Sequence, residues 1–146
     1  MSFTTVFFFL AYVPPAEIID YVASADLGIV IYENVNLNNY LCAPTKLYEF
    51  IMMKVPVAAC NFPELVELFE HYPVGVTFDP ENPKSIAQAI NSFFAKHADE
   101  RSVMDSVLEQ ARQHFTWENE SLKWLSLLKN KQKDNFVAIS QSDKFA

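Results

Sequence analysis

LGIVIYENVNLNNYLCAPTKLYEFIMMKVPVAACNFPELVELFEHYPVGVTF, residues 27–78, is the stretch that decides the fold of this 146-residue chain. It alternates short apolar runs with two segments that begin at Pro44 and Pro63 and carry apolar residues at helical spacing. The apolar runs, which we expect to be strands, cover residues 27–32, 55–60 and 74–78. Strands that alternate with helices predict βαβ units, a parallel sheet and right-handed crossovers.

The alternation extends on both sides of this stretch. Residues 4–13 form an uncharged run rich in Val and Phe, which predicts a first strand buried on both faces. Pro14 and Pro15 then begin a helix. After the turn at residues 79–83, helices are predicted over residues 83–97, 99–115 and 117–130. We therefore expect an α/β fold, a Rossmann-like parallel sheet of about four strands with flanking helices and a helical C-terminal end. The expected domain covers residues 1–130, and the polar, patternless residues 131–146 predict a disordered tail.

Composition excludes several functional classes. The net charge of −7 argues against a surface that follows the phosphates of nucleic acid or of an anionic membrane. The two glycines, Gly28 and Gly75, are too few for a glycine-rich phosphate loop. The two cysteines, Cys42 and Cys60, lack metal-ligand spacing and suit reduced thiols in the cytosol.

Membrane insertion is not expected either. The longest apolar run, residues 6–13, is far shorter than a bilayer requires, and no positive charge precedes it as in a signal peptide. We therefore expect no transmembrane segment and a cytoplasmic location, with peripheral attachment to the cytoplasmic membrane face as an alternative.

The segment around Pro44 is the strongest candidate for a binding site. Ligands of parallel sheets bind at the carboxyl ends of the strands, which here lead into the loops at residues 33–43 and 61–62. A helix that begins at Pro44 leaves backbone N–H groups free to bind a phosphate, and Lys46 adds a positive charge. Glu49, one turn further, could accept hydrogen bonds from sugar hydroxyls. The alternative is an ordinary first-turn proline with solvated Lys46 and Glu49.

Other polar and aromatic residues are weaker candidates. We interpret His71, His97 and His114 as surface histidines, because none has a metal-ligand partner at helical spacing. Asp26 suits a turn. Glu64, Glu67 and Glu70 form a solvated helix face, although Glu64 follows a crevice loop. Trp117 and Trp124 share a predicted helix and suit core or interface anchors. No nucleophile arrangement emerges from spacing.

Four segments together resemble the C-terminal, nucleotide-sugar-binding half of GT-B-fold glycosyltransferases, particularly the retaining glycosyltransferase family 4. They occur in the family's order at residues 18–29, 39–57 ("NYLCAPTKLYEFIMMKVPV"), 61–65 and 78–90. The closing helix start Phe115-Thr116-Trp117-Glu118 is also similar. The resemblance covers about four-fifths of the chain and implies half of a GT-B fold.

The resemblance also implies roles for particular residues. The family's P-x-K-x-x-E helix is matched by Pro44, Lys46 and Glu49, so that Glu49 would bind the ribose of a nucleoside diphosphate sugar. The helix N-terminus, which would hold the diphosphate, comprises Pro44, Thr45, Lys46 and Leu47. Candidates for lining the donor site are Asn39, Ala43 and Glu64. No metal or cofactor is expected, since the nucleotide sugar is the donor substrate.

Two positions depart from the family pattern. Leu41 stands where many members have a second glutamate, and Lys54 stands where a glycine is usual.

The resemblance also has consequences for partners. Whole enzymes have an N-terminal acceptor domain and additional βα units, so we expect an N-terminally incomplete domain that is inactive alone. It would pair with a separate acceptor-domain chain or self-associate through residues 3–13.

Two other functional classes remain open. The chain could be a non-catalytic interaction module that retained the sheet and lost the pocket. A receiver-like signalling domain would need acidic residues clustered at strand ends, and Asp26 and Asp79 do not form such a cluster.

Overall fold

Three short parallel strands form the centre of the molecule. They are β1 (Gly28–Val30), β2 (Val57–Cys60) and β3 (Gly75–Phe78), and their order in the sheet is β1-β2-β3. Gly28 pairs with Val57, which in turn pairs with Gly75. The predicted α/β class with a parallel sheet is therefore confirmed.

The computed structural model describes residues 12–142, with only the backbone described for residues 97–99 and 130–142. Within this part of the chain the sheet has three strands rather than the expected four or so. The strand predicted over residues 4–13 lies almost wholly outside the described residues, and Tyr12 and Val13 are not in a strand.

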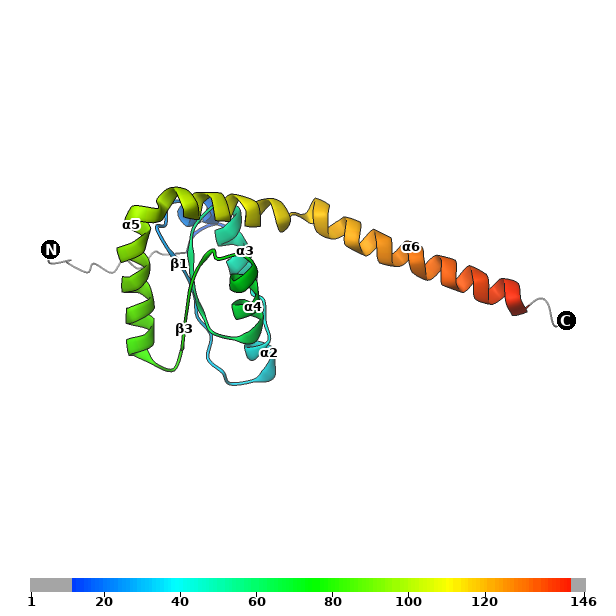
Figure 1. Cartoon of the computed structure of the whole chain (residues 1–146), viewed down its shortest axis with the longest axis horizontal. Coiled ribbons are helices and arrows are strands. Elements are labelled where there is room, and N and C mark those ends of the chain that lie inside the picture. The colour runs from blue at the N-terminus through cyan, green and yellow to red at the C-terminus, as the bar shows by residue number, and fades with distance from the viewer. Residues whose placement is uncertain (1–11, 143–146) are drawn as a thin grey trace.

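Helices cover the sheet on two sides. α3 (Thr45–Met52) and α4 (Pro63–His71) connect successive strands and lie on the same side of the sheet, opposite the first part of α5 (Pro83–His114) (Figure 1). This arrangement follows from two successive right-handed crossovers. α1 (Ile18–Ala23) precedes β1, and the single-turn α2 (Leu37–Tyr40) lies in the loop that follows it.

The helix α5 contains a kink that separates two helical segments. Glu100 has φ −114° and ψ 19°, outside the helical range, and the two segments match the predicted helices over 83–97 and 99–115. The second segment lies across the end of the sheet where the strands begin (Figure 1). The opposite end, where the strands finish and α2 lies, is not covered by α5 (Figure 1).

The hydrophobic core surrounds β2. All four residues of this strand are buried, as expected for the central strand of a parallel sheet covered on both faces. The helices contribute fully buried leucines to the same cluster: Leu47 from α3, Leu65 from α4 and Leu108 from α5. No buried polar or charged side chain occurs among the described residues.

Two backbone positions beside β2 suit glycine, one because of a close contact at Gly75 and one because of a positive φ at Lys54. A Cβ atom added to Gly75 would lie 1.8 Å from the carbonyl oxygen of Val57, so the strands can approach only because this residue has no side chain. Lys54, in the turn between α3 and β2, has φ 57°. This left-handed conformation is one that favours glycine.

The last helix differs from its prediction in length and surroundings. α6 (Trp117–Ser142) continues through residues 131–142, where the sequence predicted a disordered tail. No proline or glycine follows Pro83, so no residue of either type interrupts the helix. Trp117 and Trp124 are 74% and 63% exposed, so they are not core anchors. α6 projects away from the rest of the molecule (Figure 1).

Candidate functional site

The N-terminus of α3 offers unpaired backbone donors beside the sheet. Pro44 is the N-cap, with φ −75° and ψ 143°, and its carbonyl accepts a 3.0 Å hydrogen bond from the N–H of Leu47. The N–H groups of Thr45 and Lys46 have no acceptor within residues 12–142. Two donors and the positive end of the helix dipole therefore face outward, an arrangement that attracts anions.

Lys46 links this helix end to the carboxyl end of β1. Its ammonium nitrogen lies 4.4 Å from the ring centroid of Tyr32, which follows β1 by two residues. The aromatic ring holds the cation by its quadrupole while leaving hydrogen-bond donors available to a ligand. The predicted phosphate-binding cation thus lies at the edge of the sheet where ligands of parallel sheets bind.

Glu49 lies one helical turn beyond Lys46 on the same side of α3. It is partly exposed, and its carboxylate forms no hydrogen bond or ion pair with another described residue. Its carboxylate is therefore available to accept hydrogen bonds, which the predicted contact with a ribose requires.

A small polar pocket of about 290 Å³ lies where the strands end. Its lining residues are Asn34, Tyr40, Asn61, Phe62, Asp79, Pro80 and Glu81. The pocket joins the two loops, residues 33–43 and 61–62, that the sequence predicted to matter most. The rings of Tyr40 and Phe62 are in contact, with 5.3 Å between centroids. The Asp79 carboxylate accepts the N–H of Glu81 at 3.0 Å, so it also stabilises the turn after β3.

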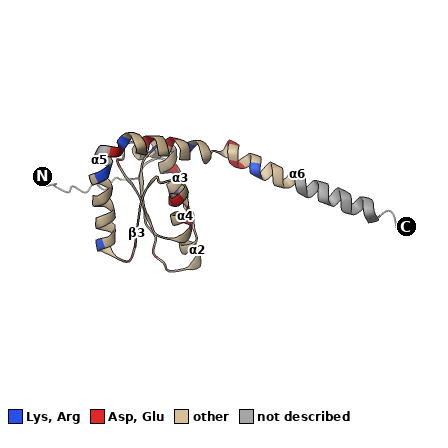
Figure 2. Ribbon diagram, viewed as in Figure 1, with Lys and Arg blue, Asp and Glu red and all other residues tan. Residues whose placement is uncertain are grey.

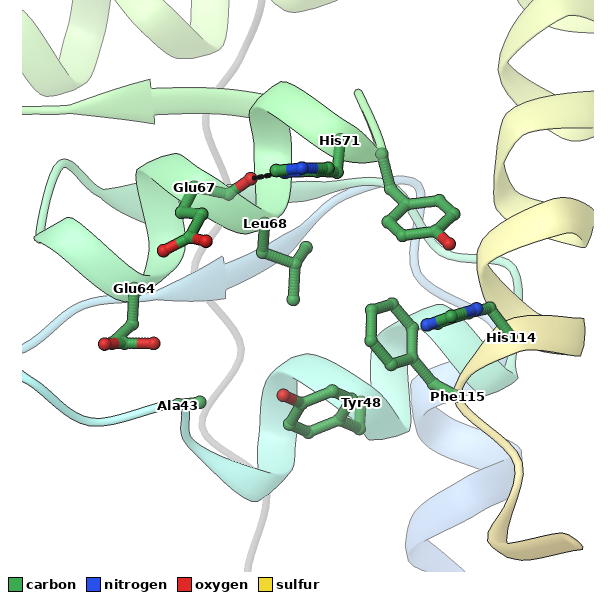
Figure 3. A pocket seen from close by; sticks show the side chains of 9 residues that line it. Ala43, Tyr48, Glu64, Glu67, Leu68, His71, His114 and Phe115 are labelled. Atoms are coloured by element: carbon green, nitrogen blue, oxygen red, sulfur yellow. Dashed lines mark hydrogen bonds between the residues drawn. The ribbon is translucent and has the colours of Figure 1, made fainter. Parts of the chain in front are cut away.

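A second, larger cavity of about 390 Å³ runs between α3 and α4. Ala43 and Glu64, two of the residues predicted to line a donor site, lie here and not in the pocket at the strand ends. Figure 3 shows the carboxylates of Glu64 and Glu67 on one side of the cavity and the rings of Tyr48 and Phe115 on the other. The carboxylates of Glu64 and Glu67 repel a diphosphate, so this cavity is less suited to one than the N-terminus of α3.

The aromatic wall of this α3–α4 cavity is well packed. Phe115 contacts Tyr48, Tyr72 and His114 with centroid distances of 5.3, 5.3 and 5.0 Å. Burial, and then the nearby charges of Glu120 and Glu64, raise the pKa of the Tyr48 hydroxyl above its ordinary value. Tyr48 thus stays protonated and can donate a hydrogen bond over the whole physiological pH range.

Asn39 has a structural role in the loop before α3. Its side-chain amide donates to the carbonyl of Glu33 at 3.2 Å, and its backbone N–H donates to Asn36 Oδ1 at 2.8 Å. Both bonds hold the shape of the β1–α3 loop and so position the N-terminus of α3.

The histidines and cysteines form no metal centre in the described part of the chain. There, no group of three His, Cys, Asp or Glu residues is arranged to hold a metal ion. His71 and His114 are exposed, in agreement with the sequence prediction, whereas the side chain of His97 lies outside the described set. Cys42 and Cys60 are both free, and burial raises the pKa of the Cys60 thiol. A thiol with a raised pKa is a weak nucleophile at neutral pH.

The sequence analysis assigned no binding role to several side chains that line these cavities, although Asn61 lies in a loop that it singled out. Asn61 and Asp79 directly follow β2 and β3, so their position after predicted strands was an available signal. Tyr72 and His114 come from elements more than 40 positions apart, and only the packing of α5 brings their rings to 5.2 Å. No local pattern carries that information.

No protein-family model, curated protein or solved structure matches the chain. No helix among residues 12–142 is both long and apolar enough to cross a membrane. The fold and site together define a parallel-sheet α/β protein with an anion-attracting helix N-terminus near the carboxyl end of its sheet.

Proposed function

We propose that this chain binds a nucleoside diphosphate sugar and is the donor-binding part of a retaining glycosyltransferase with a GT-B fold. The observation that carries the proposal is the N-terminus of α3, where the N–H groups of Thr45 and Lys46 lack acceptors in the described chain and the Lys46 ammonium lies over Tyr32. Such an end can hold a diphosphate by hydrogen bonds and by its dipole.

Glu49 and Lys54 add support. The Glu49 carboxylate has no partner among the described residues and lies one turn from Lys46, the spacing at which a ribose can reach it when the diphosphate is bound. Lys54 has φ 57°, the backbone conformation for which the family's glycine is suited. This backbone conformation at Lys54 is therefore compatible with the resemblance, although the side chain departs from it.

In the proposed reaction the glycosidic bond between the sugar C1 and the diphosphate oxygen breaks. The nucleoside diphosphate leaves with the electron pair, and the acceptor hydroxyl forms the new bond at C1 while its proton passes to an oxygen of the leaving diphosphate. The α3 N-terminus and Lys46 stabilise the negative charge that develops on the leaving diphosphate. Positioning of the acceptor requires an acceptor domain, so we expect no sugar transfer by this chain alone.

A binding titration tests the proposal. UDP, GDP and their sugars are titrated by calorimetry against the wild type, Glu49→Ala and Lys46→Ala. Loss of hydrogen bonds between the ribose and Glu49 should cost roughly 1.5 to 3 kcal/mol, about ten- to a hundredfold in affinity. Glu67→Ala is the matched control, because it removes a carboxylate from the α3–α4 cavity instead. Equal affinity of Glu49→Ala and wild type, or an effect of Glu67→Ala alone, would refute the site assignment.

The acidic rim at the strand ends favours a second candidate, a non-catalytic interaction module. Asp79 and Glu81 line the pocket there and oppose the binding of a diphosphate in it. This candidate predicts that none of the nucleotides binds at millimolar concentration, whereas the donor-binding proposal predicts binding that depends on Glu49.

A further inference from the structure

α6 presents the largest set of exposed apolar side chains in the described part of the protein. Trp117, Leu122, Trp124, Leu125, Leu127 and Leu128 are each between 50% and 74% exposed. Scattered exposed leucines are ordinary, but six large exposed apolar residues within about three helical turns are an unusual concentration. A helix of this kind is stable in water when another surface covers it.

Trp117, Trp124 and Leu128 follow one side of the helix, whereas Leu122 and Leu127 lie away from it. Trp117, Trp124 and Leu128 are seven and four positions apart, and Ser121 completes the line at the spacing of a helix–helix seam. Leu125 lies beside this seam. The opposite side carries Asn119, Lys123 and Ser126. In the seam, bulky tryptophans alternate with a small serine, so a second helix can place a large side chain over Ser121.

The charges of α6 are arranged asymmetrically along its length. The first turn is acidic, with Glu118 and Glu120 (Figure 2), and Lys129 lies three turns further. Neither Glu118 nor Lys129 forms an ion pair with another described residue. Two such helices in parallel would place like charges together, whereas an antiparallel pair places the Glu118 end of each copy beside the Lys129 end of the other.

We propose that α6 is a self-association surface, on which two copies of this chain pair in antiparallel orientation through Trp117, Trp124 and Leu128. The exposed parts of Trp117, Trp124, Leu125 and Leu128, which lie on or beside the seam, amount to on the order of 500 Å² per copy, or about 1,000 Å² for the pair. Stable complexes bury about 1,200 Å² or more, so the dimer should be reversible and form at micromolar concentration. The body of the protein is acidic, but residues 117–133 contain two acidic and four basic residues, so net charge does not oppose pairing here.

The tryptophans provide a direct probe, because both tryptophans of the chain lie on α6. Sedimentation equilibrium and tryptophan emission are measured on the full chain from about 1 to 100 µM, the range expected for an interface of this size. We expect the mass to double and the emission maximum to move to shorter wavelength over the same concentrations. A monomer at all concentrations, or a dimer that forms without any change in emission, would overturn the proposal.

Matched variants locate the interface. Trp124→Glu should weaken dimerisation at least tenfold, since it places a charge in the centre of the seam. Ser126→Glu adds the same charge on the opposite side of α6 and should leave the dissociation constant within twofold. Neither side chain is in the core, so thermal unfolding should be alike in both. An equal effect of the two substitutions would contradict the seam, and association that persists in Trp124→Glu would assign the contact to another surface.

Charge reversal tests the orientation. In an antiparallel pair, Glu118→Lys should weaken association, and the double variant Glu118→Lys, Lys129→Glu should restore it. In a parallel pair the single reversal would still place like charges together, so the dissociation constant would change little. Weakening without restoration would reject the antiparallel arrangement.

Discussion

The two C-terminal helices differ sharply in what surrounds them. α5 packs on the sheet, and its second segment contributes Leu108 and Ala111, both 0% exposed, to the core. α6 begins three residues after α5 ends, yet its four described leucines are each at least 50% exposed. Leucine therefore has no fixed contribution to the stability of this protein: the contribution depends on whether the neighbouring elements remove it from water.

The largest expected effect concerns the sheet on which α5 packs. Gly75→Ala places a Cβ atom 1.8 Å from the Val57 carbonyl oxygen, a contact that requires β2 and β3 to separate. We expect a loss of more than about 3 kcal/mol in the free energy of unfolding, since overpacked backbone contacts have no side chain that can move aside. Denaturant unfolding by circular dichroism measures this. A loss below about 1 kcal/mol would show that the strands are not packed so closely.

The contrast between α5 and α6 is tested by one pair of variants. Leu108→Ala should cost about 2 to 5 kcal/mol, because it leaves a cavity in the core, while Leu122→Ala should change stability by less than about 0.5 kcal/mol. Both are measured by denaturant unfolding at a protein concentration where the chain is monomeric. Similar losses in the two variants would mean that α6 is buried in the monomer after all.

An ion pair connects Lys54, in the turn after α3, to Glu109 of α5. The side chain of Lys54 should therefore stabilise the folded protein, whereas its backbone conformation should destabilise it. Its ammonium lies 2.5 Å from a carboxylate oxygen of Glu109, while its φ of 57° is unfavourable for a residue with a Cβ atom. Lys54→Gly and Lys54→Ala both lose the ion pair, but only glycine relieves the backbone. Lys54→Gly should therefore be more stable than Lys54→Ala by about 1 kcal/mol in thermal unfolding. Equal stability would argue against a left-handed conformation at this position.

The smallest effect on stability is expected from the charge cluster around Glu109 of α5, which includes Arg112 and Lys54. Hydrogen bonds from Arg112, Lys54 and Gln113 lower the pKa of Glu109 from 4.5 to about 2. A lowered carboxylate pKa stabilises the folded protein above pH 4.5 and loses that contribution as the pH falls toward about 2. When unfolding is measured at a series of acid pH values, the free energy of unfolding should thus fall more steeply with decreasing pH for the wild type than for Glu109→Gln. Parallel curves would show that the cluster is screened by solvent.

Much of the fold and part of the candidate site could be predicted from local patterns. Pro44 and Pro63 mark the region where α3 and α4 begin, because proline has no N–H to lose in a first helical turn. The uninterrupted apolar run over residues 55–60 predicted a strand, and β2 lies within it and is buried throughout. The loops at residues 33–43 and 61–62 meet at one pocket, as expected when parallel strands end at the same edge.

Sequence by itself thus determined the class of fold, the beginnings of α3 to α6 and the meeting of the loops after β1 and β2 at one edge of the sheet, since each follows from spacing within one or two elements. Tertiary structure alone decided that Glu64 faces the aromatic cavity beside Tyr48 and Phe115 and not the pocket at Asn61. It also decided that Trp117 and Trp124 are exposed. The physical reason is the same in both cases: helical periodicity states which residues share a side of a helix, but only the other elements determine whether that side meets protein or water.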